Sequence, residues 1–219
     1  MKEGVVLSNV VMPWRSILCI ASIFALRVFG FMVVLPIIMH HGQDYVGASA
    51  GLLGLAIGVY GLMQACFNLA LGAWSDIIGR KNILYIGLLL IIVGSIVAAN
   101  SSSVYGLIIG RGLQGCGAIG STLMALLTDI VPGKKRGQAM ACVGASIGAS
   151  FWFAIILSPV LLIWLGLDNI FNLTALLAVL AILLTRFCLP DGKVAKLQQV
   201  VWWKNSLQVI KANKFYGCN

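Results

Sequence analysis

Six long apolar segments follow one another along the chain, and each comes close to the roughly 20 residues that a helix needs to cross a bilayer. They cover residues 16–39, 48–71, 82–99, 104–130, 137–165 and 168–188. The 219 residues are 60% hydrophobic and only 10% charged, which is more apolar surface than a soluble domain of this length can bury. The sequence therefore predicts an all-α membrane protein with six transmembrane helices.

The basic residues indicate how these helices are oriented. Thirteen of the fifteen lysines and arginines lie in the N-terminal segment, in the loops after the second and fourth spans, or from the end of the sixth span onward. The loops at 40–47, 100–103 and 166–168 hold none. Because cytoplasmic loops are enriched in Lys and Arg, we expect both termini in the cytoplasm. Residues 1–15 then form a cytoplasmic segment, and residues 189–219 form a basic, tryptophan-bearing amphipathic segment at the membrane interface.

Composition and motifs argue against several other classes of protein. The net charge of +9 is explained by the topology, and no basic and aromatic surface typical of nucleic-acid binding is found. The six cysteines are scattered through mostly apolar runs without a C-x-x-C pair, so we interpret them as packing residues. No nucleophile elbow, zinc-protease motif or P-loop occurs. We expect a non-enzymatic protein without metal or cofactor, which has the lipid bilayer as its surroundings.

A dense patch of charge, Gly72–Lys81, separates the second and third apolar segments and predicts a tight polar loop. Its first glycine permits two backbones to approach each other, and Gly79 can adopt the positive φ of a tight turn. Asp76 and Arg80 can bind each other or nearby helix termini, and the final lysine adds charge at the membrane surface.

This patch resembles the signature loop G-x-x-x-D-x-x-G-R-K between helices 2 and 3 of the major facilitator superfamily, and every fixed position is present. The resemblance implies that residues 16–188 are the N-terminal six-helix half of a twelve-helix transporter, built from two inverted three-helix repeats. Its partner would be a missing C-terminal half or a second six-helix chain. Residues 189–219 would be the start of the link between halves, truncated before a seventh helix.

Arg27 and Arg111 are the only ionisable residues well inside the apolar spans, where an arginine is costly, so each should face the bundle interior or a wet cavity. The acidic residues all lie at helix ends or in loops, so the sequence supplies no buried carboxylate to pair with either arginine. The arginines therefore meet either an anionic substrate or acidic groups on helices outside this chain. A structural alternative for Arg111 is hydrogen bonding to backbone carbonyls.

The segment that begins at Arg111 is similar to the superfamily's helix 4 signature, R-x-x-Q-G-x-G. That resemblance implies that Arg111 is coupled to proton movement and that Gln114 is a polar cavity or packing residue. It also implies an ion pair between Asp129 and Arg80 at the cytoplasmic face, which would hold the outward-facing state. Asp76 would meet the positive N-terminal end of a helix in the other half.

Small residues form stripes on two of the predicted helices. They recur at spacings of three and four in the second span, and a shorter run occurs in the fifth. Such stripes let another helix approach closely, and in the superfamily these two helices face the opposite half. Packing within the six-helix bundle is the alternative. The predicted packing glycines are Gly51, Gly54, Gly58, Gly61 and Gly72 in the first stripe, and Gly144 and Gly148 in the second.

In detail the chain looks most like the YajR-type bacterial drug/proton antiporters. Arg27, the Leu35-Pro36 step and the run 58–64 carry this resemblance, whereas the antiporter signature in the fifth span is only half met, because Ala149 replaces its proline. It implies proton-coupled transport of a small solute across a bacterial inner membrane by alternating access, with efflux favoured over uptake. Two alternatives are a six-helix structural protein without transport of its own and a half-transporter active only when paired. The substrate is not identified by these residues.

Overall fold

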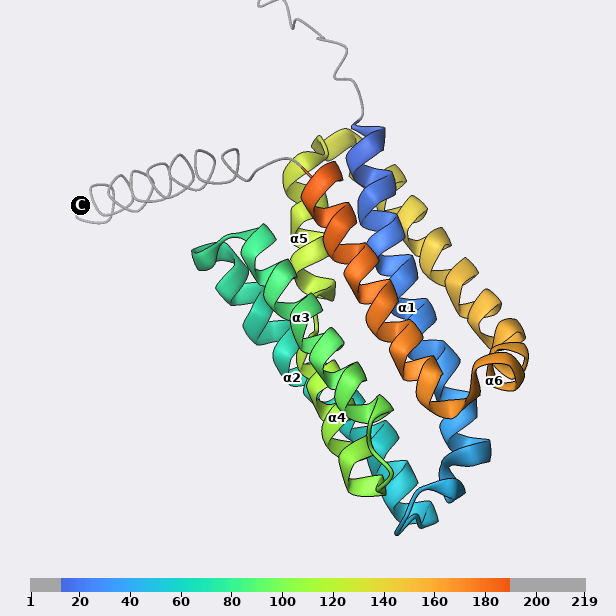
Figure 1. The fold of residues 1–219 in the computed structure, drawn as a ribbon. Helices are drawn as coiled ribbons and strands as arrows, with labels where there is room; N and C mark the ends of the chain where they lie inside the picture. Colours follow the sequence, from blue (N-terminus) through green and yellow to red (C-terminus); the bar gives the residue numbers. More distant parts are fainter. Residues whose placement is uncertain (1–12, 190–219) are drawn as a thin grey trace, which may run out of the picture. The chain divides into compact units, whose positions relative to one another are not determined.

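The computed structural model describes residues 13–189, which form helices joined by short turns, with no β-strand in this part of the chain (Figure 1). The terminal residues 1–12 and the predicted interfacial segment 189–219, apart from Leu189, lie outside the described residues. The helices are α1 (Trp14–His41), α2 (Ala50–Ile78), α3 (Arg80–Ala99), α4 (Val104–Cys116), α5 (Gly120–Ile130) and α6 (Arg136–Cys188), with short 3-10 turns η1 (Gly42–Asp44) and η2 (Gly133–Lys135).

The predicted all-α membrane fold is confirmed, and six helical stretches within residues 13–189 are long and apolar enough to cross a membrane. The fourth predicted span is divided in two, whereas the fifth and sixth spans meet at the predicted turn. The fourth span is two helices, α4 and α5, which are separated by residues 117–119 in a glycine-rich stretch of low helix propensity. The fifth and sixth spans are two limbs of α6, residues 136–165 and 167–188, which reverse direction at Gly166 (φ 74°, ψ 172°).

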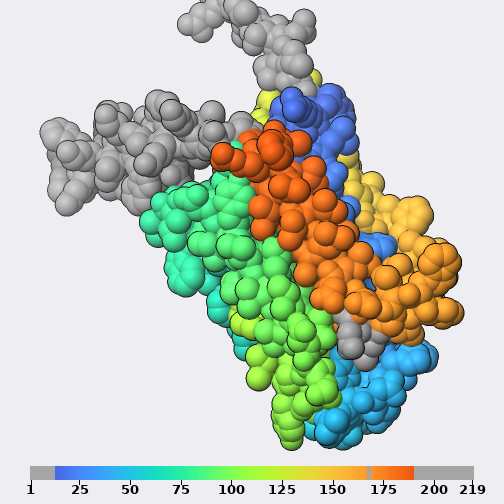
Figure 2. Space-filling view, in the orientation of Figure 1, coloured from blue at the N-terminus to red at the C-terminus, as the bar shows by residue number. Residues whose placement is uncertain are grey.

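The packing between helices has a twofold pattern. α1 packs against both limbs of α6, whereas α4 packs against α2 and α3, and α3 also contacts α6. Ser146 and Ser158 of the first limb donate hydrogen bonds to backbone carbonyls of α1, at 3.1 and 3.0 Å. Figure 2 shows the second limb of α6, in orange, on the face between α3–α4 and the first limb. This arrangement fits the predicted pair of three-helix repeats, with α1 corresponding to α4–α5.

The loops α1–α2 and α3–α4 meet at one end of the bundle. The backbone N–H of Val46 donates to the carbonyl of Ser102 at 2.9 Å, and the N–H of Val104 donates to the carbonyl of Val46 at 3.2 Å. Each loop also supplies a serine that caps the following helix: Ser49 caps α2, and Ser103 caps α4. A loop within the first repeat is therefore fixed to the loop that connects the two repeats.

α3 and α4 are in backbone contact. A Cβ atom added to Gly94 would lie 2.6 Å from both the backbone N of Gln114 and the carbonyl O of Gly110. A Cβ atom on Gly110 would in turn lie 2.7 Å from the carbonyl O of Gly94. Small residues let transmembrane helices approach this closely. These glycines were not among those predicted to pack, although Gly94 lies one residue before Ser95 and Gly110 lies four residues before Gln114, two polar residues that matter below.

Substitution of Gly94 by alanine tests this contact. Because the added methyl group meets backbone atoms that cannot move aside cheaply, we expect the free energy of unfolding to fall by about 1–3 kcal/mol. Gly58→Ala is the matched control, since its added Cβ has no atom within 4 Å. The control should be neutral or stabilising by up to about 1 kcal/mol. Thermal unfolding of both variants in detergent measures this difference. Equal unfolding midpoints for the two variants would contradict the contact.

Candidate functional site

The signature segment Gly72–Lys81 is almost entirely helical, which corrects the predicted polar loop. α2 continues through Ile78, and α3 begins at Arg80, so the turn between them is the single residue Gly79. Gly79 has φ 105° and ψ 139°, a conformation that side chains rarely adopt, as its predicted role requires. The apolar residues within the segment extend the helix beyond the predicted end of the span.

Arg80 is the centre of a charged cluster at this turn. Its Nε donates to Asp129 Oδ2 on α5 at 3.2 Å, so the predicted pair is present. The same guanidinium also contacts Asp76 and the hydroxyl of Ser75, both one turn or so earlier on α2. The Arg80 side chain is 15% exposed, against 33% for Asp129 and 49% for Asp76. One arginine therefore joins the end of α2, the start of α3 and the last turn of α5.

Gly72 allows α5 to approach α2 just before this cluster. A Cβ atom at Gly72 would lie 2.9 Å from Ser121 Oγ. The Ser121 hydroxyl donates to the carbonyl of Asn68 at 2.6 Å, and the Ser121 backbone N–H donates to Asn68 Oδ1 at 3.0 Å. Gly72 thus has the close approach predicted for it, and the contact is within the six-helix bundle.

Arg111 is 1% exposed and heads a chain of buried polar side chains. Its Nη1 donates to Gln114 Oε1 at 2.8 Å, and Gln114 Nε2 donates to the hydroxyl of Ser95 on α3, also at 2.8 Å. The hydroxyl of Thr174, on the second limb of α6, donates to the same Ser95 oxygen at 2.9 Å. Arg111 is thus bonded to the Gln114 side chain, which side chains from α3 and α6 hold in turn, and no hydrogen bond from Arg111 to a backbone carbonyl is found among the described residues.

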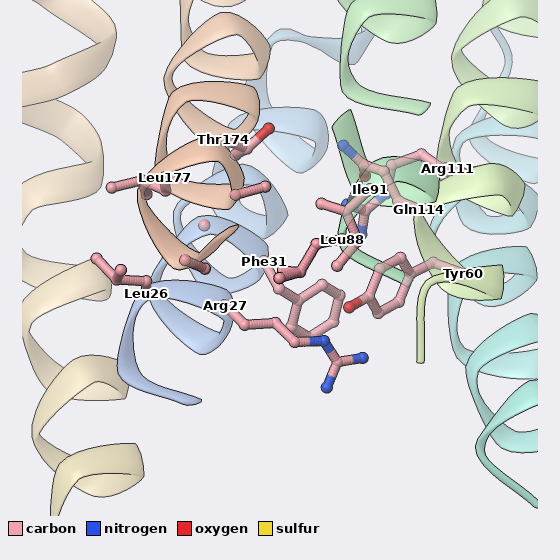
Figure 3. A pocket seen from close by; sticks show the side chains of 13 residues that line it. Leu26, Arg27, Phe31, Tyr60, Leu88, Ile91, Arg111, Gln114, Thr174 and Leu177 are labelled. Atoms are coloured by element: carbon pink, nitrogen blue, oxygen red, sulfur yellow. Dashed lines mark hydrogen bonds between the residues drawn. The ribbon is translucent and has the colours of Figure 1, made fainter. Parts of the chain in front are cut away.

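Two aromatic rings cover the Arg111 guanidinium (Figure 3). Its central carbon lies 4.4 Å from the ring centroid of Tyr60 and 5.3 Å from that of Phe31. The two rings stack on each other, with centroids 4.3 Å apart and planes 12° from parallel. Such cation–π contacts stabilise a desolvated guanidinium by about 2 kcal/mol. Arg111 Nε and Nη2 are buried with no hydrogen-bond partner in the described part of the chain.

Arg27 lines the same cavity from α1, and its Nε and Nη2 are likewise buried without a hydrogen-bond partner among residues 13–189. Figure 3 shows Arg27 and Arg111 near the stacked Phe31 and Tyr60 rings, on side chains from α1 and α4. The rest of the cavity wall is mainly aliphatic, and α2, α3 and the second limb of α6 contribute to it. Within the described part of the chain, the lining residues include no acid: Leu26, Arg27, Gly30, Phe31, Tyr60, Leu88, Ile91, Arg111, Gln114, Thr174, Leu177, Ala178 and Ala181.

Four residues of this site were not predicted from the sequence: Phe31, Tyr60, Ser95 and Thr174. Hydroxyl side chains in the middle of apolar spans were the available signal for Ser95 and Thr174, because a buried hydroxyl needs a partner. The aromatic pair left no comparable signal, since Phe and Tyr are common throughout transmembrane helices. Their contact depends on how α1 and α2 face each other.

Most of the predicted packing glycines face open space within the described structure. A Cβ atom on any of them would have no atom within 4 Å, which holds for Gly51, Gly54, Gly58, Gly61, Gly144 and Gly148. The helices that carry them are also the least buried: 17% of the most apolar window is buried in α2 and in the first limb of α6, against 50% in α1. These glycines do not pack within the bundle, and their contact with another unit stays a prediction.

Comparison with known proteins agrees with this geometry. The family profile of the Major Facilitator Superfamily matches residues 17–216. The chain belongs to the major facilitator superfamily. It is 42% identical over 180 residues to the inner membrane transport protein YajR of Escherichia coli K12, and 29% identical over 137 residues to the class E tetracycline resistance protein of Escherichia coli. It is therefore a multi-pass membrane protein of a transporter family and not an enzyme.

The similarity covers most of this chain but less than half of these relatives. The match takes in 82% of the chain and 40% of YajR, and 61% of the chain and 34% of the tetracycline resistance protein. Among solved structures, the inward-open xylose transporter XylE of E. coli has a TM-score of 0.70 at 16% identity, over 94% of this chain and 57% of XylE. The fold of the six helices is thus that of one part of a larger transporter.

The charged cluster predicts unequal coupling of Arg80 to its two acids. In a double-mutant cycle with Arg80→Gln and Asp129→Asn, we expect a coupling energy of about 0.5–1 kcal/mol. Asp76→Asn in place of Asp129→Asn is the matched control, and its coupling should be smaller because Asp76 is more exposed. Thermal unfolding in detergent supplies the four free energies of each cycle. Equal couplings, or a larger one for Asp76, would contradict the assignment of Asp129 as the principal partner.

Proposed function

We propose that this chain forms one of two six-helix units of a proton-coupled secondary transporter, which moves a small solute by alternating access. The observation that carries the proposal is the interior cavity whose wall, as far as residues 13–189 are described, includes two arginines and no acid. A guanidinium buried in an apolar bundle is costly unless an opposite charge meets it. The cavity is therefore suited to a solute or a protonatable group that arrives during the transport cycle.

Proton coupling is supported by the environment of Arg111. The residue remains charged at any physiological pH, so it cannot itself carry the proton. It can, however, favour the ionised form of a carboxyl group beside it and release that group on protonation. The carboxyl group would come from the substrate or from the second six-helix unit. Gln114 holds the guanidinium in place for either partner.

The second unit would cover α2 and the first limb of α6. These helices have little buried surface, and their small residues at Gly54, Gly58, Gly144 and Gly148 leave room for a close helix contact. Alternating access needs cavity walls from both units, which rock against each other. The counterpart is carried either on the same polypeptide or on a second chain.

The charged cluster at Gly79 would act as a cytoplasmic lock. Arg80 joins three helix ends through Asp129 and Asp76, and these contacts would hold the outward-facing state. When the unit rocks, Asp76 would exchange Arg80 for the positive N-terminal end of a helix in the other unit. Efflux is the direction in keeping with the relation to tetracycline resistance proteins. The location would be a bacterial inner membrane, with both termini in the cytoplasm.

Transport requires the second unit, and a fusion tests this. The chain is joined to the part of YajR that it does not match and reconstituted beside the unfused chain in vesicles loaded with a pH-sensitive dye. We expect tetracycline, or another compound of a screened panel, to dissipate an imposed pH gradient only through the fusion. Arg111→Gln should abolish the response, and Asp44→Asn, on the exposed η1 turn, should not. Transport by the unfused chain would refute the need for two units.

Orientation has a separate test. Alkaline phosphatase, which is active only outside the cytoplasm, is inserted after Ser102 or after Lys134. These sites lie in loops at opposite ends of the predicted spans, and the positive charge of η2 supports a cytoplasmic position for Lys134. We expect activity from the first insertion and none from the second. Activity from both, or the reverse pattern, would overturn the proposed topology.

A further inference from the structure

We propose that Phe31 and Tyr60 act together as an aromatic lid, which covers the Arg111 guanidinium in the described structure and opens, as α1 and α2 part, to let an ionised partner reach it. This inference rests on the proposed transport function and states what controls access to its central charge. It follows from how completely Arg111 is enclosed, which helices carry the two rings and what the enclosed charge lacks.

Arg111 is closed off in the described structure. The residue is 1% exposed, and its Nε and Nη2 atoms have almost no accessible surface and no hydrogen-bond partner among residues 13–189. The cavity beside it measures about 30 Å³, which is room for about one or two water molecules and far too little for a solute. An ionised partner therefore reaches the guanidinium only after part of this enclosure has moved.

The polar side of the enclosure is the rigid one. Gln114 accepts a hydrogen bond from Arg111 Nη1 and is itself anchored on the Ser95 hydroxyl of α3, each at 2.8 Å. At the same level the backbones of α3 and α4 are in contact through Gly94. Separation of these two helices would break buried hydrogen bonds and close packing together, which is costly in an apolar interior.

The aromatic side is held by ring contacts. The central guanidinium carbon lies 4.4 Å from the Tyr60 centroid and 5.3 Å from that of Phe31, and the two rings stack on each other (Figure 3). Phe31 belongs to α1, which packs along α6, whereas Tyr60 belongs to α2, which packs along α4. α1 and α2 share little other contact. The stack therefore bridges two separately packed parts of the bundle, and its opening breaks no hydrogen bond between the two side chains.

An anionic partner would favour the open lid. With the lid closed, one neutral amide oxygen and two ring faces compensate only part of the desolvation of the guanidinium. With the lid open, a carboxylate can reach Nε and Nη2, the two donors that the closed state leaves unpartnered. A ligand shifts a conformational equilibrium only by the difference in its affinity for the two states. An ionised partner therefore drives opening, whereas a neutral one does not.

The test measures how fast methylglyoxal, a small neutral dicarbonyl that adds to guanidinium groups, modifies each arginine of the full chain in lipid nanodiscs. Peptide mass spectrometry gives the rate at Arg111, and the exposed Arg186 is the internal reference. In the unaltered chain we expect Arg111 to react measurably but much more slowly than Arg186, because modification waits for the lid to open. Tyr60→Ala removes the nearer ring and should raise the rate at Arg111 about tenfold or more.

Further variants separate the lid from other roles of the rings. Phe31→Ala keeps the nearer ring but removes its stacking partner, and it should raise the rate at Arg111 severalfold. Tyr60→Phe keeps both rings and should react like the unaltered chain, which distinguishes ring cover from bonding by the hydroxyl. Phe153→Ala, which removes an exposed ring from the first limb of α6, is the matched control and should leave the rate unchanged. If Tyr60→Ala does not fold, Tyr60→Leu should still raise the rate severalfold.

Ile20→Ala controls for general loosening of the bundle, because it removes a fully buried α1 side chain outside the cavity wall. It should lower the unfolding temperature without accelerating the modification of Arg111. An equal acceleration by Ile20→Ala and Tyr60→Ala would show that modification needs unfolding of the whole bundle, and would overturn the lid. Arg111 that reacts as fast as Arg186 in the unaltered chain, that never reacts there, or that is unaffected by the ring variants would overturn it as well.

The same data separate this inference from the function on which it rests. Slow modification of Arg111 that the ring variants accelerate, together with no proton-coupled movement of any compound by the YajR fusion, would support the lid and refute the transport mechanism. Proton-coupled movement by the fusion, with Arg111 modified as fast as Arg186 in the unaltered chain, would do the opposite.

Discussion

The backbone contact between α3 and α4 determines where the polar centre of this protein lies. Because Gly94 and Gly110 have no side chains, the two helices approach until the backbone of Gln114 is next to Gly94. Ser95, the residue after Gly94, then reaches the Gln114 amide at 2.8 Å. Gln114 in turn orients Arg111, so the position of the buried charge follows from a contact between glycines. A larger residue at either glycine would move the whole chain of hydrogen bonds.

The two arginine sites differ in how their charge is compensated. Arg80, near the end of the bundle, has two carboxylates and a hydroxyl as partners and retains some exposure to solvent. Arg111, in the interior, has one amide oxygen and two aromatic rings. An arginine with full pairing fixes structure, whereas one with unfilled donors in a low-dielectric cavity is available to a mobile partner. Of these two signature arginines, Arg80 is therefore suited to fixing the structure, and Arg111 is suited to binding a mobile partner.

Much of the fold could be predicted from the sequence, because bilayer length and charge distribution constrain apolar segments strongly. The turn at Gly79 could also be predicted from its residues, and the Arg80–Asp129 pair from the resemblance to the major facilitator superfamily. The helical state of residues 72–78 did not, since a charged patch beside Ala, Trp and Ile can continue a helix as readily as end it. The cavity could not be predicted from the sequence for another reason. Phe31, Tyr60, Ser95 and Thr174 come from four helices, and their meeting depends on packing that no single segment encodes.

Two of the reversals in this bundle, at Gly79 and at Gly166, occupy a single residue each. A helix advances by about 100° and 1.5 Å per residue. If one residue were inserted at Gly79 and the shift continued along α3, Ser95 would therefore turn away from α4. One residue inserted at Gly166 would likewise turn Thr174, on the second limb of α6, away from Ser95. Gene variants that change the length of the chain at either turn should therefore be rare.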